Sequence, residues 1–208
     1  MNYQKELEKI IKGLDSRPGL LLHSCCAPCS SYCLEYLSSF FRITVFYYNP
    51  NITIREEYDH RITEQKRLIE EMNARYNLDI NFASGKYEPE RFFETIKGME
   101  KCPEGGERCR RCFDLRLGEA AGYASDHGFD FFTTTLTISP LKNADILNEL
   151  GNKKAKEYNI AFLPSDFKKN NGYKRSIELS AEYGLYRQNY CGCIFSKNES
   201  MLKKQERI

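Results

Sequence analysis

The stretch LLLHSCCAPCSS, residues 20–31, decides the fold, because a short apolar run leads directly into a turn and then a helix. The run from Leu20 to Ser24 has the length and the continuous apolar start of a buried strand. Pro28 stands where a helix can begin, since the first helical turn does not use the N–H group that proline lacks. A strand, a turn and a helix in this order are typical of a parallel α/β sheet.

Outward from this stretch, apolar runs alternate with helical periodicities along the whole chain. Further strands are expected at residues 42–48, 79–83, 129–135 and 160–163. The helical patterns between them predict right-handed crossovers, and hence a parallel twisted sheet with helices on both faces. We therefore expect one α/β domain over residues 1–208, with residues 165–208 as a basic C-terminal extension.

The composition narrows the class of protein. The hydrophobic fraction of 41% is ordinary for a globular chain. The longest aliphatic run is three leucines, and the N-terminal residues carry charges of both signs, so we expect no membrane helix and no signal peptide. This favours the cytoplasm, where thiols stay reduced. The nine cysteines are an odd number and cannot all pair, so their clusters favour metal or redox chemistry.

The turn after the first strand holds Cys25, Cys26 and Cys29. Side chains alternate along a strand, so two adjacent cysteines cannot both face one core, but in a turn both thiolates can converge on a polynuclear cluster. A turn that begins a helix also lowers the pKa of a thiol, which favours metal binding. We expect Cys33 to be a small core residue, whereas His23 either tunes a cluster or is a hydrogen-bonded rim histidine.

Cys109 and Cys112 form a C-x-x-C motif at the start of an expected helix. The spacing suits a thioredoxin-like redox pair or half of a metal site, but a glycine-rich loop rather than a strand precedes it. Together with Cys25 and Cys26 it gives four thiolates, which suit structural zinc or a four-iron, four-sulfur cluster. Zinc sites of this class use two separate C-x-x-C pairs, and two adjacent cysteines do not match that spacing. The pattern therefore favours an iron–sulfur cluster.

The sequence Cys191-Gly192-Cys193 lies near the C-terminus. Two cysteines separated by one glycine can close a small, strained disulfide of the easily reduced kind. Exposed thiols in a polar tail have little use in packing. We therefore expect a redox or ligand role for Cys191 and Cys193 rather than idle thiols.

The first turn lacks what an ATP-binding loop needs. Nucleotide-binding proteins of the pyrophosphatase-loop kind cradle phosphate with glycine-rich backbone after the first strand. Residues 24–28 contain no glycine, and Pro28 removes one N–H group. The architecture suits ATP but the loop does not, so we expect no ATP.

Several longer segments, in the expected order, closely resemble the QueH-type epoxyqueuosine reductases. They are LLHSCCAPCSS (21–31), YYNPNI (47–52), EYDHR (57–61), PEGGERCRRCFDLRL (103–117), TTTLTISPLKNADIL (133–147) and SDFKKNNGYKRSIELSAEYGLYRQNYCGCIFS (165–196). The resemblance implies a pyrophosphatase-loop, Rossmann-like fold. It also implies an oxidoreductase that removes the epoxide oxygen of epoxyqueuosine at the wobble position of tRNA, giving queuosine.

The resemblance further implies the cofactors and their ligands. It implies a four-iron, four-sulfur cluster held by Cys25, Cys26, Cys109 and Cys112, and a redox-active pair formed by Cys191 and Cys193. It also implies an additional mononuclear iron and no cobalamin. We take Cys29 and Asp166 as candidate ligands of that second iron, which could polarise the epoxide oxygen.

The implied partners are a tRNA with a GUN anticodon that carries epoxyqueuosine, and an electron donor of unknown identity. No association with a membrane is expected. Anticodon bases stack on aromatic or arginine planes. The candidate contacts are Tyr47, Asn49, Arg175 and Arg187. Tyr47 and Tyr48 alternate in a strand, so one of them should belong to the core. From residue 166 onward nine bases minus five acids give +4, against −2 for the rest (22 minus 24), which permits a phosphate-binding lip.

Two other functions compete with this interpretation. The chain could be a zinc-stabilised RNA-binding module without catalysis, or an iron–sulfur tRNA thiolation enzyme. The second would need ATP, and the glycine-free loop disfavours it. The iron and sulfide content of the protein separates the reductase from the zinc module.

Overall fold

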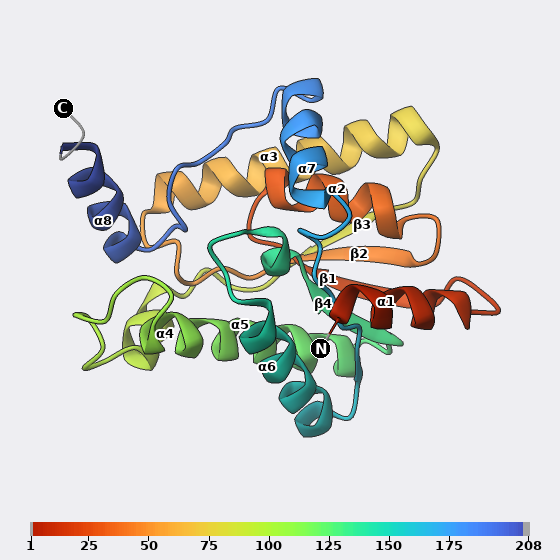
Figure 1. Cartoon of the computed structure of the whole chain (residues 1–208), viewed down its shortest axis with the longest axis horizontal. Coiled ribbons are helices and arrows are strands. Elements are labelled where there is room, and N and C mark those ends of the chain that lie inside the picture. The colour runs from red at the N-terminus through yellow and green to blue at the C-terminus, as the bar shows by residue number, and fades with distance from the viewer. Residues whose placement is uncertain (1, 206–208) are drawn as a thin grey trace.

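A five-stranded sheet forms the centre of the computed structural model, which describes residues 2–205 (Figure 1). Its strands are β1 (Gly19–His23), β2 (Arg42–Tyr47), β3 (Asn81–Ser84), β4 (Phe131–Thr134) and β5 (Ala161–Phe162). They lie in the order β3-β2-β1-β4-β5, and every neighbouring pair is parallel. The predicted α/β class with a parallel sheet is confirmed, and the strand that opens the cysteine turn is the central one.

Helices cover both faces of this sheet, as predicted. They are α1 (Tyr3–Lys12), α2 (Ala27–Leu37), α3 (Arg55–Tyr76), α4 (Pro89–Thr95), α5 (Glu107–Asp126), α6 (Ala144–Tyr158), α7 (Gly172–Glu182) and α8 (Ile194–Gln205), with a 3₁₀ turn η1 (Thr135–Ile138). In Figure 1, α2, α3 and α7 lie on one side of the sheet and α5 and α6 on the other. Side chains of β1 alternate between the two faces of the sheet. Leu20 and Leu22 pack against α2, α3 and α7 in the first core, and Leu21 packs against α5 and α6 in the second core.

The helix α8 was not expected from the sequence. Its Ser196 Oγ lies 3.1 Å from Glu104 Oε1, and its Glu199 accepts from Arg108 Nη2 at 3.0 Å. These contacts hold the C-terminal extension against the first turn of α5 and the loop before it. The single-domain organisation of residues 1–208 stays a prediction, and residues 206–208 of the extension lie outside the described part of the chain.

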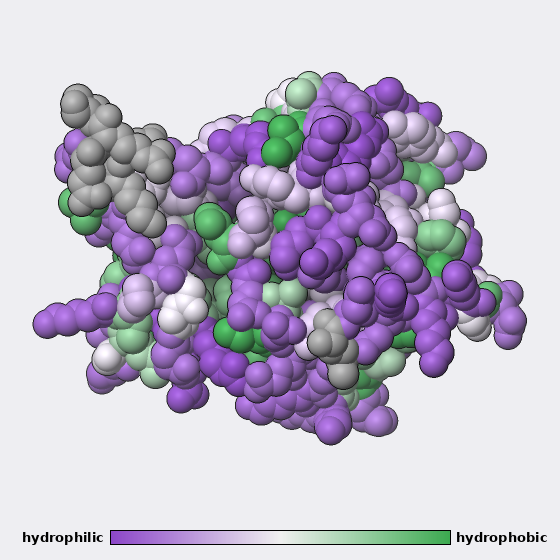
Figure 2. Space-filling view, viewed as in Figure 1, coloured by the Kyte–Doolittle hydropathy of each residue, from purple (hydrophilic) through white to green (hydrophobic). Residues whose placement is uncertain are grey.

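The surface on the side shown in Figure 2 is mainly hydrophilic, and its hydrophobic side chains form small separate areas. In residues 2–205, none of the helices has both the length and the apolar character that crossing a membrane requires.

Three strand ends meet at one edge of the sheet, as the parallel arrangement predicts. At the end of β1, Ser24 N donates to Phe46 O at 2.9 Å, and Ser24 O accepts from Asn49 Nδ2 at 2.8 Å. On the other side, His23 Nδ1 lies 2.9 Å from Thr134 Oγ1 at the end of β4. The cysteine turn therefore begins between two neighbouring strand ends, where α/β proteins bind their ligands.

Candidate metal and redox site

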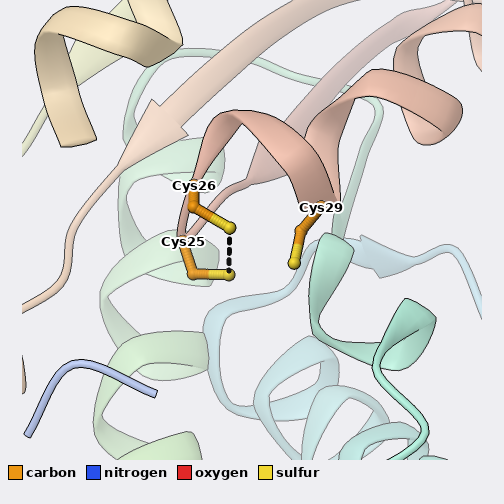
Figure 3. Close-up of side chains that lie close together, drawn as sticks. All are labelled: Cys25, Cys26 and Cys29. Atoms are coloured by element: carbon orange, nitrogen blue, oxygen red, sulfur yellow. Dashed lines mark hydrogen bonds between the residues drawn. The ribbon is translucent and has the colours of Figure 1, made fainter. Parts of the chain in front are cut away.

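Cys25, Cys26 and Cys29 bring their sulfur atoms together at the end of β1. All three sulfurs lie within 4.8 Å of one another, and those of Cys25 and Cys26 are 3.7 Å apart. Figure 3 shows the three side chains pointing toward one space beneath the turn, two from the loop and one from the first turn of α2. Three convergent thiols are a suitable donor set for a thiophilic metal, and this part of the predicted metal site is formed.

A buried hydrogen-bond network supports the turn from behind. Gln65 Oε1 on α3 accepts from Ser24 Oγ at 2.8 Å and from Ser30 Oγ at 2.7 Å. Ser30 Oγ also lies 3.0 Å from Cys26 O. Because these partners are buried, the backbone that carries the cysteines is fixed before any ligand binds.

The three thiols interact so that Cys25 has a lowered pKa while the pKa values of Cys26 and Cys29 are raised. Hydrogen bonds from Cys26 and Cys29 hold the pKa of Cys25 well below its usual range, and Lys142 and Arg116 lower it further. The bond to Cys25 raises the pKa of Cys26 to about 12. A metal must displace the remaining thiol protons, and positive charge nearby makes that displacement easier.

Lys142 supplies part of this positive charge. It follows η1 and faces a cavity that Cys25, Cys29 and Cys191 also line. Burial by itself lowers the pKa of Lys142, but the three thiols raise it overall, so the ammonium stays charged. No motif in the sequence indicated Lys142.

The second cysteine pair lies on the first turns of α5. Cys109 Sγ accepts from Gly105 N at 3.2 Å, and Cys112 packs with Phe92 and Cys193. Burial raises the pKa of Cys112 to about 12. Within the described chain, these two sulfurs lie outside the 4.8 Å group at the first turn, so the set of four cluster ligands remains a prediction.

The Cys191-Gly192-Cys193 loop is held against α3 by a buried arginine. Arg61 donates from Nη1 to Cys191 O at 3.1 Å, and its partner Glu57 lies 2.6 Å away. Gly192 has a φ of +130°, and a Cβ there would lie 2.8 Å from Ile52 Cγ1. Both the backbone conformation and the close approach to Ile52 therefore require glycine.

Cys191 and Cys193 are both free thiols, so the disulfide that their spacing permits is open in this structure. One expectation for this loop was wrong, because Cys193 is not exposed: it is 7% accessible and packs against Phe92 and Ile96. The reason is that α4 and the unexpected helix α8 cover what the sequence suggested was a polar tail.

A cavity of about 570 Å³ lies between the first turn and the Cys-Gly-Cys loop. Cys25 and Cys29 line one wall and Cys191 lines another. The remaining lining is mixed, with apolar, aromatic and charged side chains from α2, η1 and the loop after it, α7 and the loop before α8; among them are Pro28, Ile138, Leu141, Lys142, Tyr173 and Arg187. Thiols, apolar surface and positively charged side chains thus line one open cavity.

The predicted aromatic contact is not available. Tyr47 and Tyr48 are both fully buried, although their alternation predicted that only one belonged to the core. Tyr47 packs with Tyr58 in a small core, and Tyr48 lies past the end of β2, where Arg91 Nη1 lies 3.1 Å from its hydroxyl. Tyr173, at the cavity, is an aromatic residue that the sequence analysis missed.

Of the other residues predicted to bind substrate or iron, only one lines the cavity. Arg187 lines the cavity. Arg175 lies on α7 and forms ion pairs of 2.7 Å with Glu35 and Glu182. Asn49 is buried and accepts from Arg116 Nη2 at 2.6 Å. The remaining predicted ligand, Asp166, is buried and pairs with Lys168.

Residues 20–199 match the protein family described as "Epoxyqueuosine reductase QueH". The chain belongs to the QueH family. The matched range runs from β1 into α8 and contains all three groups of cysteines. The recognition made from the sequence motifs is confirmed.

Individual QueH proteins are similar over most of this chain and most of their own length. The QueH protein of Streptococcus pyogenes serotype M1 is 44% identical over 199 residues, which are 94% of this chain and 78% of the relative. That of Staphylococcus epidermidis is 44% identical, covering 94% of this chain and 84% of the relative. That of Thermotoga maritima is 33% identical, with 90% and 94% covered. Each is named epoxyqueuosine reductase QueH.

Proposed function

We infer that this protein is an oxidoreductase that reduces epoxyqueuosine to queuosine in tRNA. Its membership of the QueH family supports the reaction. One structural observation supports where it takes place: thiols from the first turn and from the Cys-Gly-Cys loop line the same cavity. The substrate would be a tRNA with a GUN anticodon, its modified wobble base inserted into this cavity.

The reaction removes one oxygen atom from the substrate. The two C–O bonds of the epoxide break, a carbon–carbon double bond forms, and two electrons and two protons convert the oxygen to water. Oxidation of the dithiol of Cys191 and Cys193 to a disulfide releases two electrons and two protons, so this pair balances one turnover. Their presence as free thiols is the reduced state that such a step begins from. An external donor must then reduce the disulfide.

The residues suit an iron–sulfur cluster by their donor chemistry and their surroundings. We assign Cys25, Cys26, Cys109 and Cys112 as the ligands of a four-iron, four-sulfur cluster, and Cys29 and Asp166 to a separate iron. Arg116 is a fully buried guanidinium near these thiols, and two of its nitrogens find no acceptor in residues 2–205, so anionic sulfur would match its charge. When bound, these groups supply single electrons and a Lewis acid for the epoxide oxygen.

The cavity walls explain how the modified base could be held. Tyr173 offers a partly exposed ring, and Leu141 and Ile138 offer apolar surface beside it. Base stacking on an aromatic side chain stabilises single-stranded RNA by about 1–3 kcal/mol per base. Arg187 at the same cavity can attract the adjoining phosphate. We therefore replace the buried Tyr47 by Tyr173 as the stacking residue.

The proposal places the protein in the cytoplasm, where tRNA is modified and thiols stay reduced. It requires neither ATP nor cobalamin. The electron donor is treated as a separate protein or a low-potential chemical reductant.

The decisive assay is anaerobic turnover of tRNA that carries epoxyqueuosine, with dithionite as reductant. Nucleosides from the digested tRNA are separated by chromatography, and their masses are measured by mass spectrometry. The proposal predicts a time-dependent product that lacks one oxygen atom. A protein that binds the tRNA and holds iron and sulfide, yet yields only unchanged epoxyqueuosine, would contradict it.

A further inference from the structure

Arg116 on α5 is an anomaly among the buried charges of this molecule. Its side chain is fully buried. Within residues 2–205 its Nη2 donates to Asn49 Oδ1 at 2.6 Å, while Nε and Nη1 have no acceptor. Leaving donor groups of a buried cation unpaired is costly, so a native structure that does this calls for a missing acceptor.

A second buried arginine shows what a paired one looks like. Arg61 on α3 is 1% exposed, pairs with Glu57 at 2.6 Å and donates to the carbonyl of Cys191. Its contacts account for its burial, and its role is to hold a loop. Arg116 has no corresponding carboxylate among its described contacts, so holding chain segments together does not explain it.

The surroundings of Arg116 indicate which acceptor is missing. Cys112 stands four residues before it, on the same face of α5 one turn away. Burial alone would lower the pKa of Arg116, but the thiols of Cys112, Cys25 and Cys191 raise it, so the guanidinium stays charged.

We propose that Arg116 is a positioning residue for the cysteine site, whose free N–H groups donate to the ligand sulfurs of Cys25 and Cys112. Hydrogen bonds and positive charge at the sulfurs favour the reduced form of an iron–sulfur cluster. Arg116 thus raises the reduction potential of the cluster, and Asn49 orients it from the opposite side. The inference rests on the proposed function, because it takes the cluster as the occupant of the site.

The test is the midpoint potential of the reconstituted cluster, measured by redox titration followed by electron paramagnetic resonance. Arg116→Gln removes the charge and both unpaired donors. We expect the reduction equilibrium to shift at least about tenfold toward the oxidised cluster, which is about 59 mV more negative for one electron. Arg116→Lys keeps the charge without the planar donors and should shift the potential less. Arg111→Gln is the matched control, since Arg111 is an exposed arginine of the same helix paired with Glu107.

Iron and sulfide are counted in every sample before titration, which separates this inference from the proposed function. Clusters in Arg116→Gln and wild-type protein with equal potentials would overturn the role of Arg116 and leave the reductase intact. If Arg116→Gln does not fold or load, Arg116→Lys decides: an unchanged potential rejects the inference, and a negative shift supports it. Wild-type protein without iron and sulfide rejects the proposed function and this inference with it.

Discussion

The two cysteine regions that face the cavity are held in place by different means. The turn with Cys25, Cys26 and Cys29 grows directly out of the central strand, and neighbouring strand ends fix its backbone. The Cys-Gly-Cys loop is far from any strand in sequence, and Arg61 and Ser196 hold it through side-chain contacts. The first region is therefore built by the fold, and the second is added to it by contacts that can be removed one at a time.

The largest effect should come from the first region. Cys25→Ser removes a sulfur at the centre of the thiol group and the one whose thiolate the neighbours stabilise. We expect metal binding and reductase activity to fall by more than about 100-fold, beyond the loss caused by outer-shell changes. Metal analysis and single-turnover assays measure both.

Cys33→Ala is the control for this prediction. Cys33 is a buried cysteine of α2, and its sulfur packs into the first core. Its loss should reduce the free energy of unfolding while iron and sulfide stay bound. Equal metal loss in both variants would show that the thiol group has no special role.

The second effect concerns His23, which is buried in the rim of the first region. Burial lowers its pKa to about 3, so the folded protein keeps it neutral while the unfolded chain takes up a proton below pH 6.5. Stability from this residue is complete above pH 6.5 and is lost as the pH falls toward 3, in total about 5 kcal/mol. Below about pH 5.5, where the unfolded chain is almost fully protonated at this residue, the free energy of unfolding should fall by about 1.4 kcal/mol per pH unit.

Urea denaturation at a series of pH values measures this slope. His23→Gln keeps a donor for Tyr48 O and should flatten it. The exposed His60 offers the control substitution His60→Gln. A slope that survives in His23→Gln would refute the assignment to this histidine.

The third effect tests whether the Arg61 side chain holds the Cys-Gly-Cys loop in place. Arg61→Gln breaks the buried pair with Glu57 and frees the carbonyl of Cys191. We expect a loss of about 3 kcal/mol in the free energy of unfolding, together with faster alkylation of Cys191 and Cys193. Mass spectrometry of the alkylated peptides follows the two thiols separately.

Arg55→Gln on the same helix is the matched control, because its pair with Asp59 is exposed. Exposed pairs contribute about 1 kcal/mol or less. If both variants lose equal stability and the thiols of the loop react no faster, Arg61 does not hold the loop.

The smallest effect concerns the cavity between the two regions. Tyr173→Ala removes the partly exposed ring at the cavity. We expect KM for the tRNA to rise about tenfold, with kcat nearly unchanged, because stacking contributes about 1–3 kcal/mol per base. Tyr76→Ala, at a tyrosine of similar exposure outside the cavity lining, should leave KM as it is. Equal kinetics in the two variants would remove Tyr173 from the binding surface.

The same comparison explains how far the sequence could predict the site. The strand and turn around Cys25 and Cys26 follow from local patterns, because periodicity and the proline report directly on backbone conformation. The burial of Cys193 depends on α4, which contacts it from a distant part of the sequence, and on α8, which begins at the next residue. Local patterns contain no information about such packing, and the tail was wrongly expected to be exposed.

Arg116 and Lys142 mark a second limit of sequence reasoning. The spacing of Cys112 and Arg116 on one helix face could have indicated Arg116, but only the structure shows that two of its donors lack acceptors within the described chain. Lys142 reaches the thiols from the loop after η1, and no spacing predicts that. In each case the essential observation is closeness to the thiols, which depends on the assembled fold.

The most direct test of the account is the metal content of the anaerobically purified protein, read together with its visible absorption. The account predicts a coloured protein with four irons and four sulfides per chain in the cluster, additional iron at the second site, and loss of colour on reduction. A colourless protein that contains zinc and no sulfide would contradict it.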